Sequence, residues 1–375
     1  MQKLTEHAPE FIRAIAPYKA GKPVSDVVRE LGLDPNTVVK LASNENPLGL
    51  GEKAKAAIAQ AAADLGRYPD ANGFSLKAKL AARHGVGADQ ITLGNGSNDV
   101  LELAAKAFLT QGSNAVFSQY AFAVYPLATQ GCGAQSKVVP AVCYSHDLDG
   151  FLKTIDANTR VVFIANPNNP TGTFLPQDKL LAFLKQVPQQ VLVVLDEAYN
   201  EFLKPEDQYD STQWVAQFHN LLVSRSFSKA YGLAGLRVGY AVSSVEVADL
   251  MNRVRQPFNV NSLALAAAEA AVDDHEFLKQ TYDVNLNGLE QIQDGLKALN
   301  LEYVPSYGNF VLFKAGVGAD AGMKVFDALQ RLGVIVRPVN GYGLPEWLRV
   351  SIGLPHENDA FLKALPKALA TLQAS

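Results

Sequence analysis

The chain has 375 residues, enough for two or three domains. Hydrophobic residues make up 48% and charged residues 19%, which excludes a disordered chain and a small disulfide-stapled protein. Lysine and arginine number 33 against 37 aspartate and glutamate, and this net charge of -4 excludes a broad basic surface for nucleic acid or anionic lipid.

The N-terminal residues, the apolar runs and the cysteines predict neither export nor a membrane span. Residues 1–7 lack the apolar core of a signal peptide, and no stretch reaches the roughly 18 consecutive apolar residues of a membrane helix. Cys132 and Cys143 have no metal-site spacing, so we expect free thiols in a reducing compartment. These features predict a cytoplasmic protein that binds no metal, no membrane and no nucleic acid.

Short apolar runs alternate with amphipathic stretches of helical length after the first 38 residues. Those 38 residues, with Pro9, Pro17 and Pro23, predict an N-terminal arm. Several runs are apolar at every position, which is typical of strands buried on both faces of a mainly parallel sheet. We therefore expect a large α/β domain over residues 39–273. The predicted strands are residues 90–93, 113–118, 160–165, 190–195, 220–223 and 238–242.

The remaining sequence predicts a smaller α/β domain over residues 274–375. It contains a long charged helix at about 274–299, strand-like runs at 310–313 and 334–336, and a closing helix from about residue 357. Ser262 is the expected N-cap of a helix over 263–272 that joins the two domains.

Polar residues follow several of the predicted strands at their carboxyl ends, where open α/β sheets bind ligands. Asn169 follows the run at 160–165, and Asp196 and Tyr199 follow the run at 190–195. Lys229 comes six residues after the run at 220–223, beyond a Ser-Phe-Ser turn. We expect these side chains to meet in one crevice.

The Gly-rich turn at residues 94–99 links a predicted strand to a helix, and its backbone N–H groups and the helix dipole suit a phosphate. Asp99 stands where a dinucleotide fingerprint needs its third glycine, which argues against a nicotinamide dehydrogenase, and no Walker A lysine follows. Arg237 and Ser228 offer a cation and a hydroxyl to the same anion. Taken alone, the turn is equally explained as a tight turn with Asp99 on the helix dipole.

Lys229 and Asp196 together indicate a specific chemistry. A lysine held in a crevice has a lowered pKa and forms Schiff bases, and a buried carboxylate requires a cation such as a protonated heteroaromatic nitrogen. With a phosphate turn beside them, they match what pyridoxal phosphate requires. Each has an ordinary alternative: Asp196 as a helix N-cap, Asn169 as a turn residue, Lys229 as a solvated side chain.

The segments 169–172 (NPTG), 196–199 (DEAY) and 226–229 (SFSK), with Arg237, resemble the signature of fold-type I, pyridoxal-phosphate-dependent aminotransferases. The finer pattern is similar to the histidinol-phosphate aminotransferase family, at 41–49 (LASNENPLG), 67–70 (RYPD), 234–239 (AGLRVG) and 348–353 (LRVSIG). The resemblance runs from about Pro17 to the C-terminal helix. It implies an α/β fold whose large domain has a mainly parallel seven-stranded sheet between helices, with a smaller C-terminal α/β domain.

The resemblance also implies a role for each matching residue. Lys229 would carry the cofactor as an aldimine, Asp196 would pair with its ring nitrogen, and Tyr199 and Asn169 would bond its phenolic oxygen. The remaining implied cofactor ligands are Ser97, Asn98, Ser226, Ser228 and Arg237 for the phosphate, Tyr125 stacked on the ring, and Tyr68 reaching across a homodimer interface. Tyr120 and Phe122 lie in the same aromatic segment, so the identity of the stacking residue stays open.

The implied substrate-binding residues are Tyr18, Asn309, Arg337 and Arg349. They suit transfer of an amino group from histidinol phosphate to 2-oxoglutarate, a step of histidine biosynthesis, because arginine pairs bind phosphate and carboxylate alike. An aromatic amino acid aminotransferase and a threonine-phosphate decarboxylase are alternatives, since sequence does not show which substrate bond is broken. A non-catalytic ligand-binding module is a third, and it predicts no cofactor absorbance.

Overall fold

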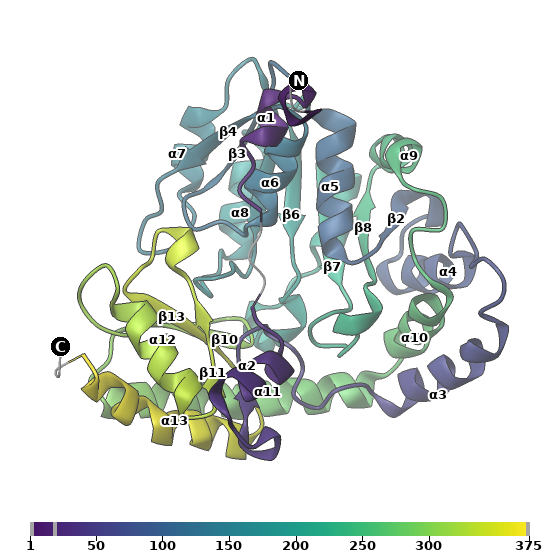
Figure 1. Ribbon diagram of the computed structural model, residues 1–375. Coiled ribbons are helices and arrows are strands. Elements are labelled where there is room, and N and C mark those ends of the chain that lie inside the picture. The colour runs from purple at the N-terminus through teal and green to yellow at the C-terminus, as the bar shows by residue number, and fades with distance from the viewer. Residues whose placement is uncertain (1–3, 18–20, 373–375) are drawn as a thin grey trace.

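The computed structural model describes residues 4–17 and 21–372, and it contains three β-sheets (Figure 1). The strands are β1 (Val39–Lys40), β2 (Ile91–Gly94), β3 (Asn114–Ser118), β4 (Gln135–Val139), β5 (Thr159–Ala165), β6 (Leu192–Asp196), β7 (Leu221–Ser226), β8 (Gly239–Ser243), β9 (Tyr303–Val304), β10 (Phe310–Lys314), β11 (Val334–Ile335), β12 (Arg337–Pro338) and β13 (Trp347–Ser351).

Thirteen α-helices lie within the described residues. They are α1 (Glu10–Arg13), α2 (Val24–Leu31), α3 (Glu52–Ala61), α4 (Phe74–His84), α5 (Ser97–Phe108), α6 (Val124–Gly131), α7 (Leu148–Thr154), α8 (Gln177–Leu184), α9 (Val245–Val254), α10 (Ser262–Val272), α11 (His275–Ala298), α12 (Ala321–Arg331) and α13 (Pro355–Ala370). The helix before α11 is capped by the Asn261 side chain, which accepts from the amide of Ala264, so the predicted cap Ser262 is instead the first helical residue.

The largest sheet has seven strands in the order β2-β8-β7-β6-β5-β3-β4, and only β8 runs antiparallel to its neighbours. This confirms the mainly parallel seven-stranded sheet. Each of the six predicted strands is present. The sequence missed β4, because this edge strand is mostly exposed and carries polar residues instead of an apolar run.

Helices cover both faces of this sheet. One buried apolar cluster joins the sheet to α4, α7, α8 and α10, and a second joins the other face to α5, α6 and α9. Two covered faces explain why the central strands are apolar at almost every position. The strands β5, β6 and β7 are parallel, so their carboxyl ends lie at one edge of the large sheet. This edge faces the C-terminal part of the molecule (Figure 1).

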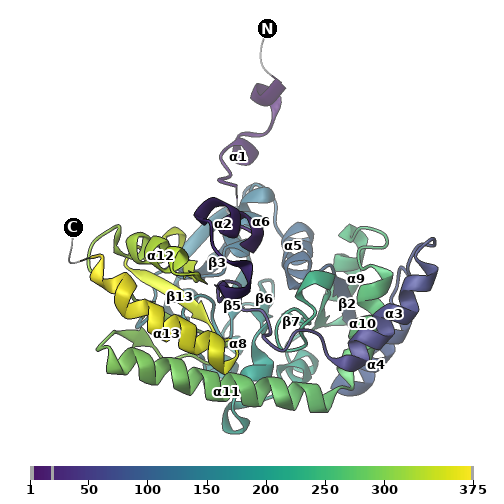
Figure 2. The ribbon, with the colours of Figure 1, turned by 60° about the horizontal axis from the view of Figure 1, so that its bottom comes forward.

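The C-terminal part has an antiparallel sheet in the order β12-β13-β10-β9, packed with α11, α12 and α13 around its own apolar cluster. The long helix α11 runs beneath both sheets (Figure 2). β1 pairs with β11, so the chain just after residue 38 lies against the C-terminal sheet region before it enters the large sheet. The predicted domain boundaries remain predictions.

Candidate active site

A cavity of about 330 Å³ lies where the carboxyl ends of β5, β6 and β7 face the C-terminal sheet. Its wall brings together most of the predicted site residues. They are Ser97, Asn98, Asn169, Asp196, Tyr199, Ser226, Ser228, Lys229, Arg237, Arg337 and Arg349. The shared edge of a parallel sheet explains this convergence, because Ala165, Asp196 and Ser224 are register partners on neighbouring strands.

Lys229 lies three residues beyond β7, and its Nζ donates to the backbone oxygen of Ser43 at 3.1 Å. The pKa of this amine is lowered to about 8, chiefly by burial and also by the positive charges of Arg349 and Arg237, while Glu45 opposes them. Such an amine is partly neutral near neutral pH, and the neutral form is the nucleophile.

Asp196 ends β6 and is 5% exposed. Its Oδ2 accepts the hydroxyl of Tyr125 at 2.9 Å, whereas its buried Oδ1 has no hydrogen-bond partner among the described residues. Burial raises the pKa of the carboxyl to about 6, against the opposing influence of Tyr125, the Ala198 amide and Lys229. A buried carboxylate oxygen left unsatisfied is costly, so this atom is suited to a cationic or donor group of a ligand.

The Tyr199 hydroxyl is held by a residue from the N-terminal part of the chain. Nδ2 of Asn44 donates to it at 3.0 Å, and the Asn44 side-chain oxygen accepts from Ser351 Oγ at 2.9 Å. Because the phenolic oxygen accepts the amide, its own proton is left to donate into the cavity. Burial raises the pKa of Tyr199 to about 12, so it is protonated at neutral pH.

Two arginines line the side of the cavity that faces the C-terminal sheet. Arg337 and Arg349 are register partners on β12 and β13, an arrangement that puts both side chains on one face of the sheet. Arg349 also donates to the side-chain oxygen of Asn169 and, at 2.8 Å, to the backbone oxygen of Ala42. Paired guanidinium groups suit a carboxylate or a phosphate.

An anion cradle lies at the N-terminus of α5. The helix begins at Ser97 after Gly96, whose φ of +85° favours glycine, and a Cβ there would collide with the Arg237 guanidinium. Arg237 Nη1 also donates to Ser228 Oγ at 3.3 Å. Backbone N–H groups at a helix start, a cation and hydroxyls together form a phosphate site.

Tyr125 does not lie where the sequence analysis put it. It is fully buried behind Asp196, with its ring stacked on Phe163 at a centroid distance of 4.8 Å, so it is not part of the cavity wall. Phe122 lines the cavity instead. The prediction that Tyr125 stacks on a bound ring is therefore corrected: α6 begins at Val124 and turns the Tyr125 side chain into the core, while Phe122 precedes the helix.

Two other predicted site residues, Asn309 and Tyr68, also lie apart from the cavity wall. Asn309 is buried and donates to the backbone oxygen of Asn44 at 3.0 Å, so it holds the segment beside the cavity. Tyr68 is 83% exposed and stacks on Phe258 at 4.8 Å. Tyr18 lies outside the described residues.

Residues 42–44 have a role that was not predicted from the sequence, although they lie within the motif at 41–49. Their backbone oxygens accept from Arg349, Lys229 and Asn309, and so they join the C-terminal sheet to the lysine. Asn44 adopts a left-handed backbone at φ +53°, which asparagine tolerates better than most residues. The high proportion of polar residues in this motif is the feature of the sequence that could have indicated this role.

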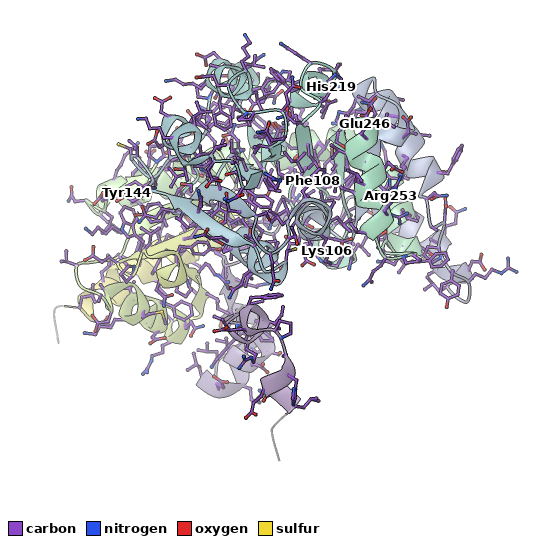
Figure 3. All side chains as sticks on the ribbon, turned by 90° about the horizontal axis from the view of Figure 1, so that it is seen from above. Lys106, Phe108, Tyr144, His219, Glu246 and Arg253 are labelled. Carbon is purple, nitrogen blue, oxygen red and sulfur yellow. The ribbon has the colours of Figure 1, made fainter. Side chains whose placement is uncertain are left out.

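The donor set of the cavity fits pyridoxal phosphate. Lys229 suits an aldehyde, Oδ1 of Asp196 suits a protonated ring nitrogen, and the α5 cradle suits a phosphate. A second hollow, lined by Phe108 and His219, lies at the opposite edge of the sheet, seen from above in Figure 3, and it lacks such a set. Among the described residues, no cluster suits a metal ion and no helix is long and apolar enough to cross a membrane.

Comparisons with known proteins agree with this geometry. A family model described as "Aminotransferase class I and II" matches residues 36–365. The chain is 59% identical to "Histidinol-phosphate aminotransferase 2" of Ralstonia nicotianae, over 99% of each chain, and 60% identical to a protein of the same name from Pseudomonas aeruginosa, over 96% of each. A histidinol-phosphate aminotransferase from Sinorhizobium meliloti, solved with pyridoxal 5'-phosphate, is 28% identical and covers 98% of each chain with a TM-score of 0.90.

Proposed function

We propose that this chain, which belongs to the aminotransferase class I and II family, uses pyridoxal phosphate to transfer an amino group from histidinol phosphate to 2-oxoglutarate. The products are imidazole-acetol phosphate and glutamate, and the pathway is histidine biosynthesis. The names of the two closely similar relatives support this substrate and do not favour an aromatic amino acid or threonine phosphate. One observation carries the proposal: a lysine of lowered pKa and an unsatisfied buried carboxylate oxygen share one cavity with two paired arginines.

Four side chains would hold the reactive end of the cofactor. Lys229 would bind its aldehyde carbon, Oδ1 of Asp196 would accept from its ring nitrogen, and Tyr199 and Asn169 would bond its phenolic oxygen. The α5 cradle, Ser226, Ser228 and Arg237 would bind its phosphate. When bound, pyridoxal phosphate supplies an electron sink that stabilises negative charge at the substrate's α-carbon.

Lys229 is proposed to transfer the proton of the substrate's α-carbon. Its Nζ, an amine of lowered pKa, would take the proton from the substrate's α-carbon as general base. The same nitrogen then returns a proton, so one residue serves both half-reactions. Asp196 would stay ionised and would keep the cofactor's ring nitrogen protonated, because this ion pair would offset the cost of burying the carboxylate.

Arg337 and Arg349 bind the anionic end of each substrate. Histidinol phosphate has a phosphate and no carboxylate, whereas glutamate has two carboxylates, and a guanidinium pair accepts either anion through bidentate hydrogen bonds. Tyr18 is proposed to add a hydroxyl to the same group. Asn309 is proposed to support substrate binding by fixing the position of Asn44, because its side-chain amide donates to the backbone oxygen of Asn44.

The functional unit is proposed to be a homodimer in which Tyr68 reaches the cofactor phosphate of the partner subunit. Leu65, Tyr68, Phe74 and Phe258 are apolar side chains 42–83% exposed, an arrangement typical of a surface that a second chain covers. A cytoplasmic location is also proposed, because Cys132 and Cys143 are free thiols, and cell fractionation tests it.

An absorbance titration of the purified protein tests the proposed reaction. Histidinol phosphate should remove the visible band of the bound cofactor, and 2-oxoglutarate should restore it. The kcat/KM for histidinol phosphate should exceed that for phenylalanine. A large preference for phenylalanine, release of carbon dioxide from threonine phosphate, or the absence of a visible band would each contradict the proposal.

A further inference from the structure

Tyr125 is a rigid residue directly behind the Asp196 carboxylate. It lies in the first turn of α6 and is 0% exposed. Its ring stacks on Phe163 with an interplanar angle of 7° and meets the edge of Phe122 at a centroid distance of 6.0 Å. These contacts fix the position of the phenolic oxygen, because the ring cannot swing without disturbing close-packed neighbours.

The hydrogen bond between the two residues has one direction. Burial raises the pKa of Tyr125 well above its usual range, and the nearby Asp196 charge raises it further, so the phenol keeps its proton. The phenol therefore donates and the carboxylate accepts, at 2.9 Å. The contact occupies Oδ2 and leaves Oδ1 as the oxygen without a partner.

A neutral donor has a particular advantage at this position. A lysine or arginine behind Asp196 would also hold the carboxylate, but it would neutralise the charge that the cofactor's ring nitrogen requires. A phenol orients and stabilises the carboxylate while its full negative charge remains available on the cavity side.

We propose that Tyr125 is a positioning residue that pins Oδ2 of Asp196 and thereby presents Oδ1 to the cofactor's ring nitrogen. This inference rests on the proposed use of pyridoxal phosphate and deepens it. It assigns Tyr125 a function behind the carboxylate in place of stacking on the ring.

The test compares two conservative variants of the full-length chain. Tyr125→Phe removes only the hydroxyl and keeps the stacked ring. Tyr240→Phe is the matched control: Tyr240 is 3% exposed, its hydroxyl lies 2.9 Å from His84 Nε2, and it is two strands away from Asp196. Both variants lose one buried tyrosine hydroxyl, so they share any general cost to folding.

The first measurement is the dissociation constant of pyridoxal phosphate from each apoenzyme. Tyr125→Phe should weaken cofactor binding about tenfold or more and lower kcat, with KM for histidinol phosphate unchanged, since a hydrogen bond to a charged group is lost. Tyr240→Phe should bind the cofactor as the wild type does. If both variants lose thermal stability alike and bind the cofactor within twofold of the wild type, Tyr125 is structural only and the inference is overturned.

A crystal structure of the wild-type chain with pyridoxal phosphate gives a second readout that needs no variant to fold. The Tyr125 oxygen should remain within hydrogen-bond distance of Asp196, and Phe122 should lie nearer the ring. Tyr125 stacked on the cofactor would overturn the inference while leaving the proposed function intact. A wild-type chain that does not bind the cofactor would overturn both.

Discussion

Burial shifts the pKa of Lys229 and of Asp196 in opposite directions, and each shift favours the neutral side chain. For the lysine, the neutral form is the reactive one, and the pKa of about 8 makes it available. For the aspartate, the pKa of about 6 reflects the cost of ionising a buried group, which the hydrogen bonds from Tyr125 and Ala198 and the charge of Lys229 offset only in part. A bound cofactor that supplies a ring cation would offset the rest.

The rate at which the apoenzyme captures pyridoxal phosphate should follow the protonation of Lys229. Below pH 8 the neutral fraction grows about tenfold for each pH unit, and above pH 8 it levels off, so the rate should rise and then reach a plateau. Stopped-flow absorbance between pH 6 and 10 measures it. A rate that keeps rising to the ordinary lysine pKa near 10.4 would show that the cavity does not activate the amine.

Replacing Lys229 with alanine should abolish turnover and leave the cofactor bound noncovalently, because the α5 cradle and Asp196 remain. Activity should fall at least a thousandfold, as expected when the group that transfers the proton is removed. Steady-state assays and the visible spectrum measure the two effects. Near-normal turnover would refute the role of Lys229.

Asp196→Asn should stabilise the apoenzyme at neutral pH. The folded pKa of Asp196, about 6, lies above the ordinary value of 3.8. Ionisation of Asp196 therefore lowers the free energy of unfolding above pH 6 and has no such effect below about pH 4. The two-unit difference corresponds to about 3 kcal/mol. The variant's apoenzyme should melt at a higher temperature than wild type at pH 7.5 and at the same temperature near pH 4. A variant less stable at pH 7.5 would contradict this account.

At the scale of elements, the junction of β8 with α5 forms the anion cradle. Gly239 begins β8 beside the start of α5, and a Cβ there would lie 2.5 Å from the amide nitrogen of Ser97 and 2.9 Å from the backbone oxygen of Arg225. Both atoms belong to the backbone and cannot move aside easily. The close approach that only glycine allows therefore sets where the helix N-terminus lies.

Gly239→Ala should weaken pyridoxal phosphate binding by tenfold or more, because α5 must shift away from the phosphate. Gly235→Ala is the control, since nothing lies within 4 Å of its Cβ position and its φ is not positive. Titration of each apoenzyme compares them. Equal affinities in the two variants would show that the β8–α5 approach does not matter for binding.

The sequence predicted the elements that are built from apolar runs and missed those that depend on long-range contacts. The central strands follow from burial on both faces, while the edge strand β4 has no such pattern. Asn44 bonds Tyr199 across 155 residues and needs a left-handed backbone, which no local pattern reveals. The positions of Tyr125 and Phe122 depend on where α6 begins, and boundaries are the least predictable feature of an element.

At the scale of the whole molecule, the cavity lies between two sheets, and one short segment links them. The segment at residues 42–44 accepts hydrogen bonds from Arg349 on the C-terminal sheet and from Lys229 beyond the large sheet. A shift of one sheet relative to the other would therefore move Arg349, which is proposed to bind substrate, relative to the lysine. The N-terminal residues thus belong to the site although they are far from it in sequence.

Mixing two inactive variants tests whether the molecule is a dimer with shared sites. Lys229→Ala and Tyr68→Ala, each impaired alone, should regain about a quarter of wild-type activity after mixed refolding, since half the dimers are mixed and each mixed dimer has one intact site. Size-exclusion chromatography should give a dimer for both. A monomer, or no recovery on mixing, would contradict a Tyr68 contribution across the interface.

The central claim is that Lys229 holds pyridoxal phosphate covalently in the cavity opposite Asp196. Borohydride reduction of the purified protein, followed by digestion and mass spectrometry, measures this directly. We predict a pyridoxyl group on the peptide that contains Lys229 and loss of that label in Lys229→Ala. A label on a different lysine, or on none, would contradict the account.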